Sequence, residues 1–409
     1  MTTVTIERLG HQGDGIASGP IFAPMTLPGE EVTGTLDGAT LTDIRIDVPS
    51  PLRVAPPCPH FRSCGGCKMQ HGADELVADW KRDIVVDTLK LHGLETDVRS
   101  TLTSPDRSRR RATFAARRTK KGAMAGFYGR KSDTIVPIPN CILVTPGLLQ
   151  GVPVADDLAL AGASRKGALS VTVTESVEGL DVSVSGGKPL DGPLRVGLAA
   201  LCERHALARL SWDDETIGMR VPPTQRMGHA RVVPPPGAFL QATAHGQQTL
   251  TDLVRDIVGS PKSVVDLFAG CGTFALPLAE ASEVHAVESG DDMMAALDAG
   301  WRQAQGLKRV TTESRDLFRR PLLPDELSKF DAVVIDPPRA GAAAQIAELA
   351  QAQVPVIAHV SCNPQTFARD AETLCKAGYD LEWVQPVDQF RWSAHVELVG
   401  AFRLSHIAA

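Results

Sequence analysis

The chain has 409 residues, of which 43% are hydrophobic, and a formal net charge of −6 at pH 7. This length predicts two or three domains. No apolar run reaches the roughly 18 residues of a membrane span, and no basic start precedes an apolar segment, so we expect neither a transmembrane helix nor a secretory signal. We therefore expect a cytoplasmic protein, in which disulfides between the eight cysteines are disfavoured.

Residues 1–52 are predicted to form a small β-barrel. Short alternating segments are interrupted by Gly13 and Gly15, and an Asp-Gly pair at 37–38 favours a tight turn between two more such segments. The region holds two Lys/Arg and seven Asp/Glu, which gives a local charge of −5. A barrel this acidic is expected to bind phosphate groups poorly.

A cysteine-rich segment follows a proline-punctuated linker at 49–57. The segment "CPHFRSCGGCKMQH" (58–71) contains three of the eight cysteines and two histidines. Because disulfides are disfavoured here, a metal site, an iron–sulfur site and a redox switch are the alternatives that its composition leaves open.

An amphipathic helix is predicted at residues 74–93. Leu76, Trp80 and Ile84 recur at helical spacing and define one apolar face. Asp74 is the expected N-terminal cap.

Residues 53–235 are predicted to form a central domain that contains the main basic stretch. Residues 107–131 carry ten Lys/Arg and no acid, with Phe114, Phe127 and Tyr128 between them. Cations for phosphates beside rings for bases are what an RNA-contacting surface needs. A solvated pair of strands with long basic side chains is the alternative. Since the chain as a whole is acidic, we assign RNA contact to this stretch.

Residues 236–409 predict an α/β domain with a doubly wound, mostly parallel sheet, because apolar strands alternate with Ala/Leu-rich helices. The segment "VVDLFAGCGTFALPLA" (264–279) is a buried strand, a glycine-bearing turn and a helix. Gly270 and Gly272 allow the backbone of this turn to approach a ligand closely. The spacing differs from that of the dinucleotide-binding G-x-G-x-x-G motif, which disfavours NAD.

The next strand ends in Glu288, where an acid is placed to accept hydrogen bonds from ribose hydroxyls. Asp266 and the glycine turn resemble the first motif of class I methyltransferases that use S-adenosylmethionine (AdoMet). This resemblance implies AdoMet as the cofactor. Tight packing of the strand on the helix, without a ligand, is the alternative.

Two later strands end in reactive residues. "FDAVVIDPPRAG" (330–341) places Asp336 at the carboxyl edge of the sheet, where doubly wound folds bind ligands. The following strand ends in "SCNP", which places Cys362 at the same edge. Cysteine attacks electron-poor carbon as a thiolate, so we expect a nearby positive or polar group to lower its pKa. A small core thiol is the alternative interpretation of Cys362.

Uracil is a substrate that such a thiol would serve. Carbon 5 of uracil becomes nucleophilic only when a thiolate has added to carbon 6, and a base must then remove the proton on carbon 5. Glu397 in "HVELVGAFRL" is an acid within an apolar alternating strand and is the candidate base. An acid at the surface of an edge strand is the alternative.

The segments "FLQ", "DLFAGCGTF", "DPPRAG", "SCNPQT" and "HVELV" occur in the order and spacing of the RNA uracil-5 methyltransferases, which the chain closely resembles. The resemblance implies Cys362 as the nucleophile and Glu397 as the general base. The AdoMet-binding positions that it implies are Gln241, Phe268, Thr273, Glu288, Asp316 and Asp336. Cytosine-5 RNA methyltransferases carry their nucleophilic cysteine just after an Asp-x-Pro motif, and Arg339 at that place disfavours them.

The N-terminal half extends the resemblance. The predicted barrel resembles the TRAM domain of ribosomal members of the family, and the cysteines resemble their [4Fe–4S] site, whose ligands would be Cys58, Cys64, Cys67 and Cys141. Zinc is the alternative metal, but its sites more often pair two short C-x2-C elements. Because methyl transfer needs no electron, we expect the cluster to act as a structural clamp.

The resemblance also implies a structured RNA as partner. We expect 23S ribosomal RNA, because transfer-RNA enzymes of this superfamily typically lack both the TRAM domain and the cluster; transfer RNA is the second candidate. A non-catalytic iron–sulfur protein that binds RNA is a third, and it leaves Cys362 and Glu397 without a role. We expect a monomer that binds neither DNA nor a membrane.

Overall fold

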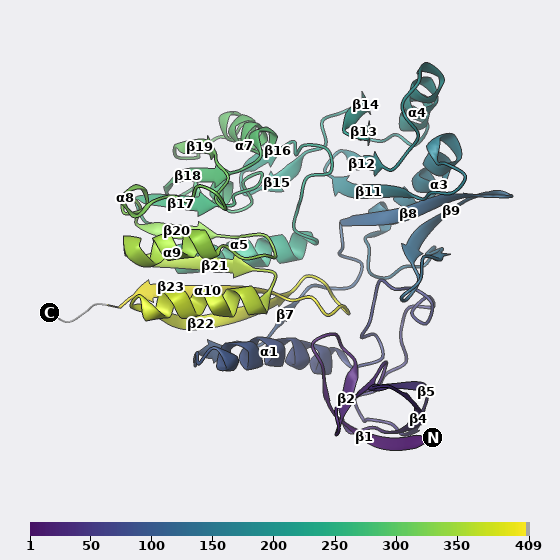
Figure 1. Cartoon of the computed structure of the whole chain (residues 1–409). Helices are drawn as coiled ribbons and strands as arrows, with labels where there is room; N and C mark the ends of the chain where they lie inside the picture. Colours follow the sequence, from purple (N-terminus) through teal and green to yellow (C-terminus); the bar gives the residue numbers. More distant parts are fainter. Residues whose placement is uncertain (406–409) are drawn as a thin grey trace.

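The computed structural model describes residues 1–405 and shows a small barrel, a central sheet and a C-terminal α/β layer structure (Figure 1). The barrel is closed, with strand order β1-β2-β3-β5-β4, as the sequence predicts. Its strands are β1 (Thr2–Leu9), β2 (Gly15–Ala17), β3 (Ile21–Ala23), β4 (Glu31–Asp37) and β5 (Thr40–Val48). Ile6, Val32 and Leu41 are almost completely buried inside it, because alternate residues of each strand face inward.

The central region is a seven-stranded sheet of order β10-β9-β8-β11-β12-β13-β14, followed by a separate β15–β16 hairpin. The strands are β8 (Arg111–Thr119), β9 (Gly122–Tyr128), β10 (Ile135–Val136), β11 (Leu169–Ser176), β12 (Gly179–Ser185), β13 (Arg209–Trp212), β14 (Glu215–Met219), β15 (Gln225–Met227) and β16 (Ala230–Val232). The helices are α2 (Pro146–Leu149), α3 (Gly151–Gly162) and α4 (Gly192–Arg204). The helix α3 packs on β8 and β9 over a core that includes Phe114 and Trp212.

The C-terminal region is doubly wound, which confirms the predicted fold class. Strands β17 to β21 run parallel in the order β19-β18-β17-β20-β21, and β23 and β22 continue the sheet antiparallel. The strands are β17 (Ser263–Leu267), β18 (Glu283–Glu288), β19 (Val310–Ser314), β20 (Ala332–Ile335), β21 (Val356–Ser361), β22 (Tyr379–Asp388) and β23 (Glu397–Leu404). The helices are α5 (Ala244–Val258), α6 (Ala275–Leu278), α7 (Asp291–Gln303), α8 (Pro324–Leu327), α9 (Ala343–Ala352) and α10 (Pro364–Lys376).

The helix α1 (Asp74–Leu91) connects the barrel to the C-terminal sheet (Figure 1). It packs on α10 and β22, and the short strands β6 (Asp97–Val98) and β7 (Leu102–Thr103) that follow it pair with β22. The indole N–H of Trp80 donates to the carbonyl of Gly10 in the barrel at 3.2 Å. The domain boundaries at 52 and 235 stay a prediction, although α1 packs with the C-terminal region.

The start of α1 differs from the sequence prediction. Ala73 occupies the cap position and no side chain caps the helix, whereas Asp74 lies in its first turn. There its carboxylate pairs with Arg391 at 2.6 Å. The acid therefore favours the positive end of the helix dipole and holds a distant loop instead of capping. Within residues 1–405, no helix is both long and apolar enough to cross a membrane.

Candidate active site

One cavity at the carboxyl edge of the parallel strands brings together all eight predicted reaction and cofactor residues. It has a volume of about 480 Å³, within the usual range for small-molecule sites. The predicted residues that line it are Gln241, Phe268, Thr273, Glu288, Asp316, Asp336, Cys362 and Glu397. Their roles stay predictions, but six separate strand ends, those of β17, β18, β19, β20 and β21 and the start of β23, lie around this one space.

The turn after β17 forms one wall of this cavity, and its backbone explains the glycines. Gly270 and Gly272 both have positive φ, and a Cβ at Gly272 would lie 2.9 Å from side-chain atoms of Leu276 and Leu297. Phe268 also has a φ of 62°, a left-handed conformation that costs a non-glycine residue energy. Strain of this kind is concentrated at ligand sites, so the turn has the geometry of a binding loop.

Glu288 stands beside this turn at the end of β18. One of its carboxylate oxygens accepts from the backbone N–H of Gly270 at 3.2 Å, and the other accepts from that of Ser289 at 2.6 Å. These bonds fix the carboxylate at the cavity wall. Across the cavity entrance, the rings of Phe268 and Phe318 lie 5.4 Å apart and form an apolar surface.

Gln389 is a buried residue behind the cavity lining that the sequence does not single out. Its side-chain N–H donates to the Gln241 carbonyl oxygen at 2.5 Å, and its own carbonyl oxygen accepts from the backbone N–H of Ala242 at 2.8 Å. It also hydrogen-bonds Glu397. Gln389 thus couples the candidate base to the glutamine of "FLQ", and the one sequence signal was its position directly after strand β22.

A buried ion pair holds the loop between β22 and β23, which leads to Glu397. Lys81 of α1 lies 2.6 Å from Asp388, and both side chains are essentially inaccessible to solvent. The same ammonium group donates to the carbonyl of His395 at 2.8 Å. The helix α1 therefore positions the strand end that carries the candidate base.

Two carboxyl groups in the cleft hold protons more tightly than usual. Burial and the nearby Asp336 raise the pKa of Glu397 from 4.5 to about 8, and burial raises the pKa of Asp336 to about 7. Without a bound cation, low-dielectric surroundings disfavour two neighbouring negative charges. The cleft is consequently suited to a positively charged ligand.

The environment of Cys362 corrects the expectation that its pKa is lowered. Burial raises the pKa of this thiol to about 11, and the carboxyl groups of Glu397 and Asp336 act in the same direction. Arg339 acts in the opposite direction but more weakly. The expected cation is present as Arg339, but the fold also brings two acids from other strand ends to the thiol.

Comparison with known proteins identifies the family of this chain. A sequence profile of the tRNA (uracil-5-)-methyltransferases matches residues 200–403. An uncharacterized RNA methyltransferase of Rhizobium meliloti is 46% identical over 97% of this chain and 98% of its own length. A 23S rRNA (uracil(1939)-C(5))-methyltransferase of a Shewanella species is 29% identical over 98% of this chain and 95% of its own. The chain belongs to the RNA uracil-5 methyltransferase family.

The fold of this AdoMet-dependent RNA methyltransferase is shared with a solved structure. The tRNA (uracil-54, C5)-methyltransferase of Pyrococcus abyssi, in complex with S-adenosyl-L-homocysteine, superposes with a TM-score of 0.75 at 22% identity. The match covers 98% of this chain and all of the Pyrococcus chain. This counterpart of nearly the whole chain is described as a tRNA enzyme. The expectation that an N-terminal barrel indicates ribosomal RNA is therefore corrected, because a similar overall architecture does not separate ribosomal from transfer RNA.

The four predicted cluster cysteines of this methyltransferase lie together, far from the cleft in sequence. The thiols of Cys58, Cys64, Cys67 and Cys141 are free, buried and line one small cavity with apolar neighbours such as Phe61, Phe127 and Ile138. Within residues 1–405, no set of three or more His, Cys, Asp or Glu side chains is arranged to hold a metal ion. A cluster is therefore not shown.

Burial divides the predicted basic surface of the methyltransferase. Phe114 is fully buried in the central core, and Arg110 is 9% exposed. The Arg110 guanidinium donates to Gln247 at 2.6 Å and to the carbonyl of Gln241 at 3.3 Å, so it joins the central region to the catalytic one. These two side chains are thus unavailable to RNA. The exposed members of the stretch are Arg107, Arg118, Lys120, Lys121, Tyr128 and Lys131.

Proposed function

We propose that this enzyme methylates carbon 5 of a uridine in 23S ribosomal RNA through a covalent adduct between Cys362 and carbon 6. The observation that carries the proposal is that Cys362 and Glu397 line the same cavity as the glycine turn after β17. The nucleophile and the base then face a ring from the space that also holds the cofactor. The target base has to leave its stack to reach this cavity.

The chemistry follows from the two side chains. The Cys362 sulfur adds to carbon 6, and the electron pair of the 5,6 double bond moves into the C4 carbonyl to give an enolate. Carbon 5 then takes up the methyl group and keeps its hydrogen. Glu397 removes that hydrogen as a proton, the 5,6 double bond forms again, and the Cys362 thiolate leaves.

The positive charge of the cofactor affects the protonation of the reacting groups. AdoMet, when bound, supplies an electrophilic methyl group on a positively charged sulfonium. Asp336 and Glu397 give up their protons more readily beside a positive charge, and so does the thiol of Cys362. Binding of the cofactor therefore favours the ionised form of each of these three groups.

The cofactor contacts follow from the positions in the cavity. Glu288 holds the ribose hydroxyls with its fixed carboxylate, and Phe268 and Phe318 supply an apolar surface for the adenine. Asp316 is itself held by the backbone N–H of Phe318 at 3.0 Å, which places its carboxylate at the same end. Gln241 and Thr273 complete the walls as polar partners.

Ribosomal RNA is the first candidate substrate, and the 29% identity over nearly the full length of the Shewanella 23S enzyme supports it. Transfer RNA is the second candidate, because the full-length fold match is to a tRNA enzyme. A non-catalytic RNA-binding role leaves the assembled cleft unexplained. The five-stranded barrel serves as the TRAM domain in this proposal.

We also propose a [4Fe–4S] cluster on Cys58, Cys64, Cys67 and Cys141. Four free thiols around one apolar cavity fit its all-thiolate ligand set. A single zinc ion, which binds four thiolates at about 2.3 Å, is the alternative metal. Burial raises the pKa of the Cys141 thiol, and backbone hydrogen bonds from Val144 and Leu143 act in the opposite direction.

Base mapping in ribosomal and transfer RNA from a deletion strain tests the substrate. The proposal predicts that 5-methyluridine disappears from one site or more in 23S RNA, is restored by the wild-type gene and is not restored by Cys362→Ala. Loss confined to transfer RNA would replace the first candidate by the second.

A further inference from the structure

A second cavity, of about 280 Å³, lies on the other side of Cys362. Its polar lining comes from five separate parts of the chain, and the residues used below are His11, Gln12, Thr88, Arg339, Gln365 and His395. Two of these belong to the loop that follows β1 in the barrel. The second cavity is therefore the place where the barrel contributes directly to the surroundings of the nucleophile.

This second cavity is connected to the reaction cavity without being part of it. Cys362 and Arg339 line both spaces, whereas Glu397 and the glycine turn line only the first. In the proposed mechanism the reacting carbons of uracil lie between Cys362, Glu397 and the cofactor. In this mechanism the second cavity does not hold that ring, but it adjoins the position of the ring because Cys362 and Arg339 line both spaces.

The barrel side of the second cavity is held in place by the cysteine-rich segment. The ammonium group of Lys68 donates to the backbone carbonyl of Gln12 at 3.2 Å and to its side-chain carbonyl oxygen at 3.1 Å. The backbone N–H of Lys68 donates in turn to the carbonyl of Trp392 at 2.7 Å. Lys68 thus fixes the orientation of the Gln12 amide relative to the loop that leads to Glu397.

The opposite wall is equally ordered. The Gln365 amide donates to the hydroxyl of Thr88 on α1 at 3.4 Å. The ring of His395 packs edge-on against that of Phe390, with 5.8 Å between ring centres. Amide and imidazole groups both donate and accept hydrogen bonds, and imidazole rings also stack on bases, so this lining matches the edges and faces of a nucleobase.

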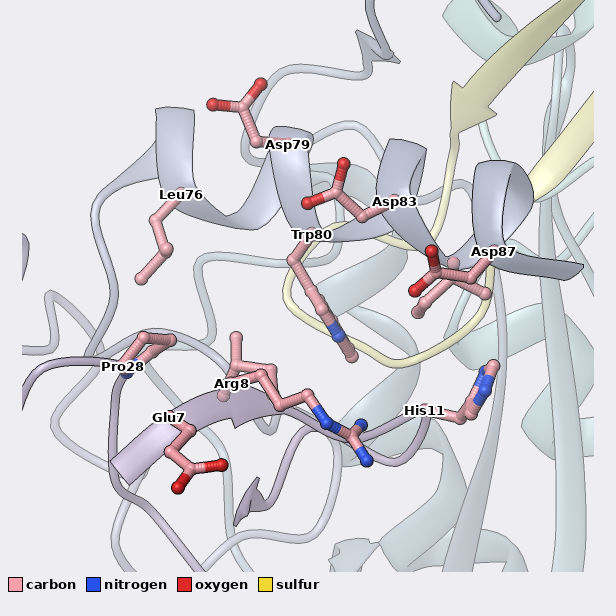
Figure 2. Close-up of a pocket in the computed structure, with 11 residues that line it drawn as sticks. Glu7, Arg8, His11, Pro28, Leu76, Asp79, Trp80, Asp83 and Asp87 are labelled. Carbon is pink, nitrogen blue, oxygen red and sulfur yellow. The ribbon is translucent and has the colours of Figure 1, made fainter. Parts of the chain in front are cut away.

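Charge distinguishes the two sides of α1. On the side that Figure 2 shows, Asp79, Asp83 and Asp87 project from successive turns of α1 above Glu7 and Arg8 of the barrel, an arrangement that repels phosphates. On the other side, the positive charges that act on His395 are, in decreasing order, those of Arg339, Lys81, Lys68 and Arg109; Arg339 is exposed, whereas Lys81 is buried and paired with Asp388. His11 lies between the two sides and lines both the acidic pocket of Figure 2 and the second cavity. An RNA backbone is therefore directed towards the second cavity.

We propose that this second cavity binds the nucleotide directly joined to the target uridine, and that Gln12 and His11 of the barrel read its base. The inference rests on the proposed function and deepens it by naming specificity-determining residues for the same reaction. It gives the acidic barrel a task that needs no grip on phosphates, because the barrel supplies hydrogen bonds to one base while Arg339 supplies the positive charge.

Kinetics with altered RNAs test this proposal. The substrates are hairpin transcripts around the mapped uridine, identical except for the nucleotide on one or the other side of it. The enzymes are wild type, Gln12→Ala, His11→Ala and, as a matched control, Glu31→Ala, which removes an exposed barrel side chain outside both cavities. AdoMet binding is measured for each by calorimetry.

Wild type and Glu31→Ala are expected to prefer one nucleotide at one flanking position. Gln12→Ala should lose that preference and raise KM for the preferred RNA about 3- to 10-fold, the value of one or two hydrogen bonds, with kcat and AdoMet affinity unchanged. His11→Ala should act in the same direction. Unchanged preference and KM in both variants, or an equal loss on every transcript, would overturn the proposal. If wild type methylates none of the transcripts, the proposed function fails instead.

Discussion

The two cysteine sites of this enzyme contain the same functional group in opposite surroundings. Cys362 is half-buried at a strand end, beside two carboxyl groups and Arg339, in a cavity that opens to ligands. The other four thiols are buried among apolar side chains, and the charged groups nearest Cys67 and Cys141 include Arg109. Burial raises the pKa of Cys362 and of Cys67 alike, to about 11 and about 12.

The two sites differ in what can enter them and lower the raised pKa of their thiols. At Cys362 a bound cation and a reacting ring can enter, so its ionisation is coupled to substrate binding. At the four-cysteine cavity only a positively charged metal centre held by all the thiols would do so, and it would join residues 58–67 to the segment around Cys141. Under the proposed function, the thiol of Cys362 performs chemistry, whereas the four other thiols hold segments of the chain together.

Replacement of the nucleophile is the sharpest way to break this comparison. Cys362→Ala should lower methylation by about 10⁴-fold or more, because in the proposed mechanism its thiolate activates carbon 5. AdoMet affinity and the unfolding midpoint should stay close to wild type. Cys375→Ala, in α10 and outside the cavity, is the control and should retain full activity. Substantial turnover by Cys362→Ala would exclude the thiolate mechanism.

The four-cysteine cavity should respond in the opposite way. Anaerobically purified wild type should contain about four irons per chain. Cys67→Ser should lose iron and destabilise the fold by about 5 kcal/mol or more, because metal binding energy is folding energy. The remaining folded enzyme should still form 5-methyluridine. Iron analysis, thermal unfolding and turnover per folded molecule measure the three effects. A colourless protein with one zinc per chain would contradict the cluster.

The ion pair between Lys81 of α1 and Asp388 at the end of β22 tests how the fold supports the cleft. Lys81→Met leaves the carboxylate of Asp388 buried without its partner and should cost about 3–5 kcal/mol in the free energy of unfolding. Adding Asp388→Leu should recover part of that loss. Urea unfolding of both variants measures it. A single variant as stable as wild type would show that this pair does not hold the loop.

The smallest expected effect is a pH dependence of stability. The pKa of Glu397 rises from 4.5 to about 8 in the folded protein, so its contribution is complete below pH 4.5 and is lost as pH rises through 8. Wild type without ligand should lose about 2 kcal/mol between pH 6 and pH 8 relative to Glu397→Gln, which cannot ionise. Thermal unfolding of both proteins across this range measures the difference. Parallel profiles would contradict the raised pKa.

The sequence predicts the cleft well because its residues lie in short contiguous motifs at strand ends. A parallel sheet brings those ends to one edge, so the position of Asp336 or Cys362 in its strand already determines its neighbourhood. The barrel is predictable for a similar reason, since alternation and tight turns are local patterns.

Contacts between distant segments could not be predicted in this way. Gln389 and Lys81 have no motif around them: Lys81 has its role because α1 packs on β22, and Gln389 because it meets the distant residues Gln241 and Glu397. The raised pKa of Cys362 also depends on acids from two other strands. Within the basic stretch, sequence alone does not reveal that Phe114 faces the core and Arg110 bridges two regions.

The covalent adduct is the most direct test of the account. Glu397→Gln, incubated with AdoMet and the substrate RNA, should accumulate a complex that survives denaturation and has the mass of one chain plus one methylated RNA. Glu397→Gln combined with Cys362→Ala should form none. A Glu397→Gln enzyme that releases 5-methyluridine at the wild-type rate, or an adduct that persists without Cys362, would contradict the assignment of nucleophile and base.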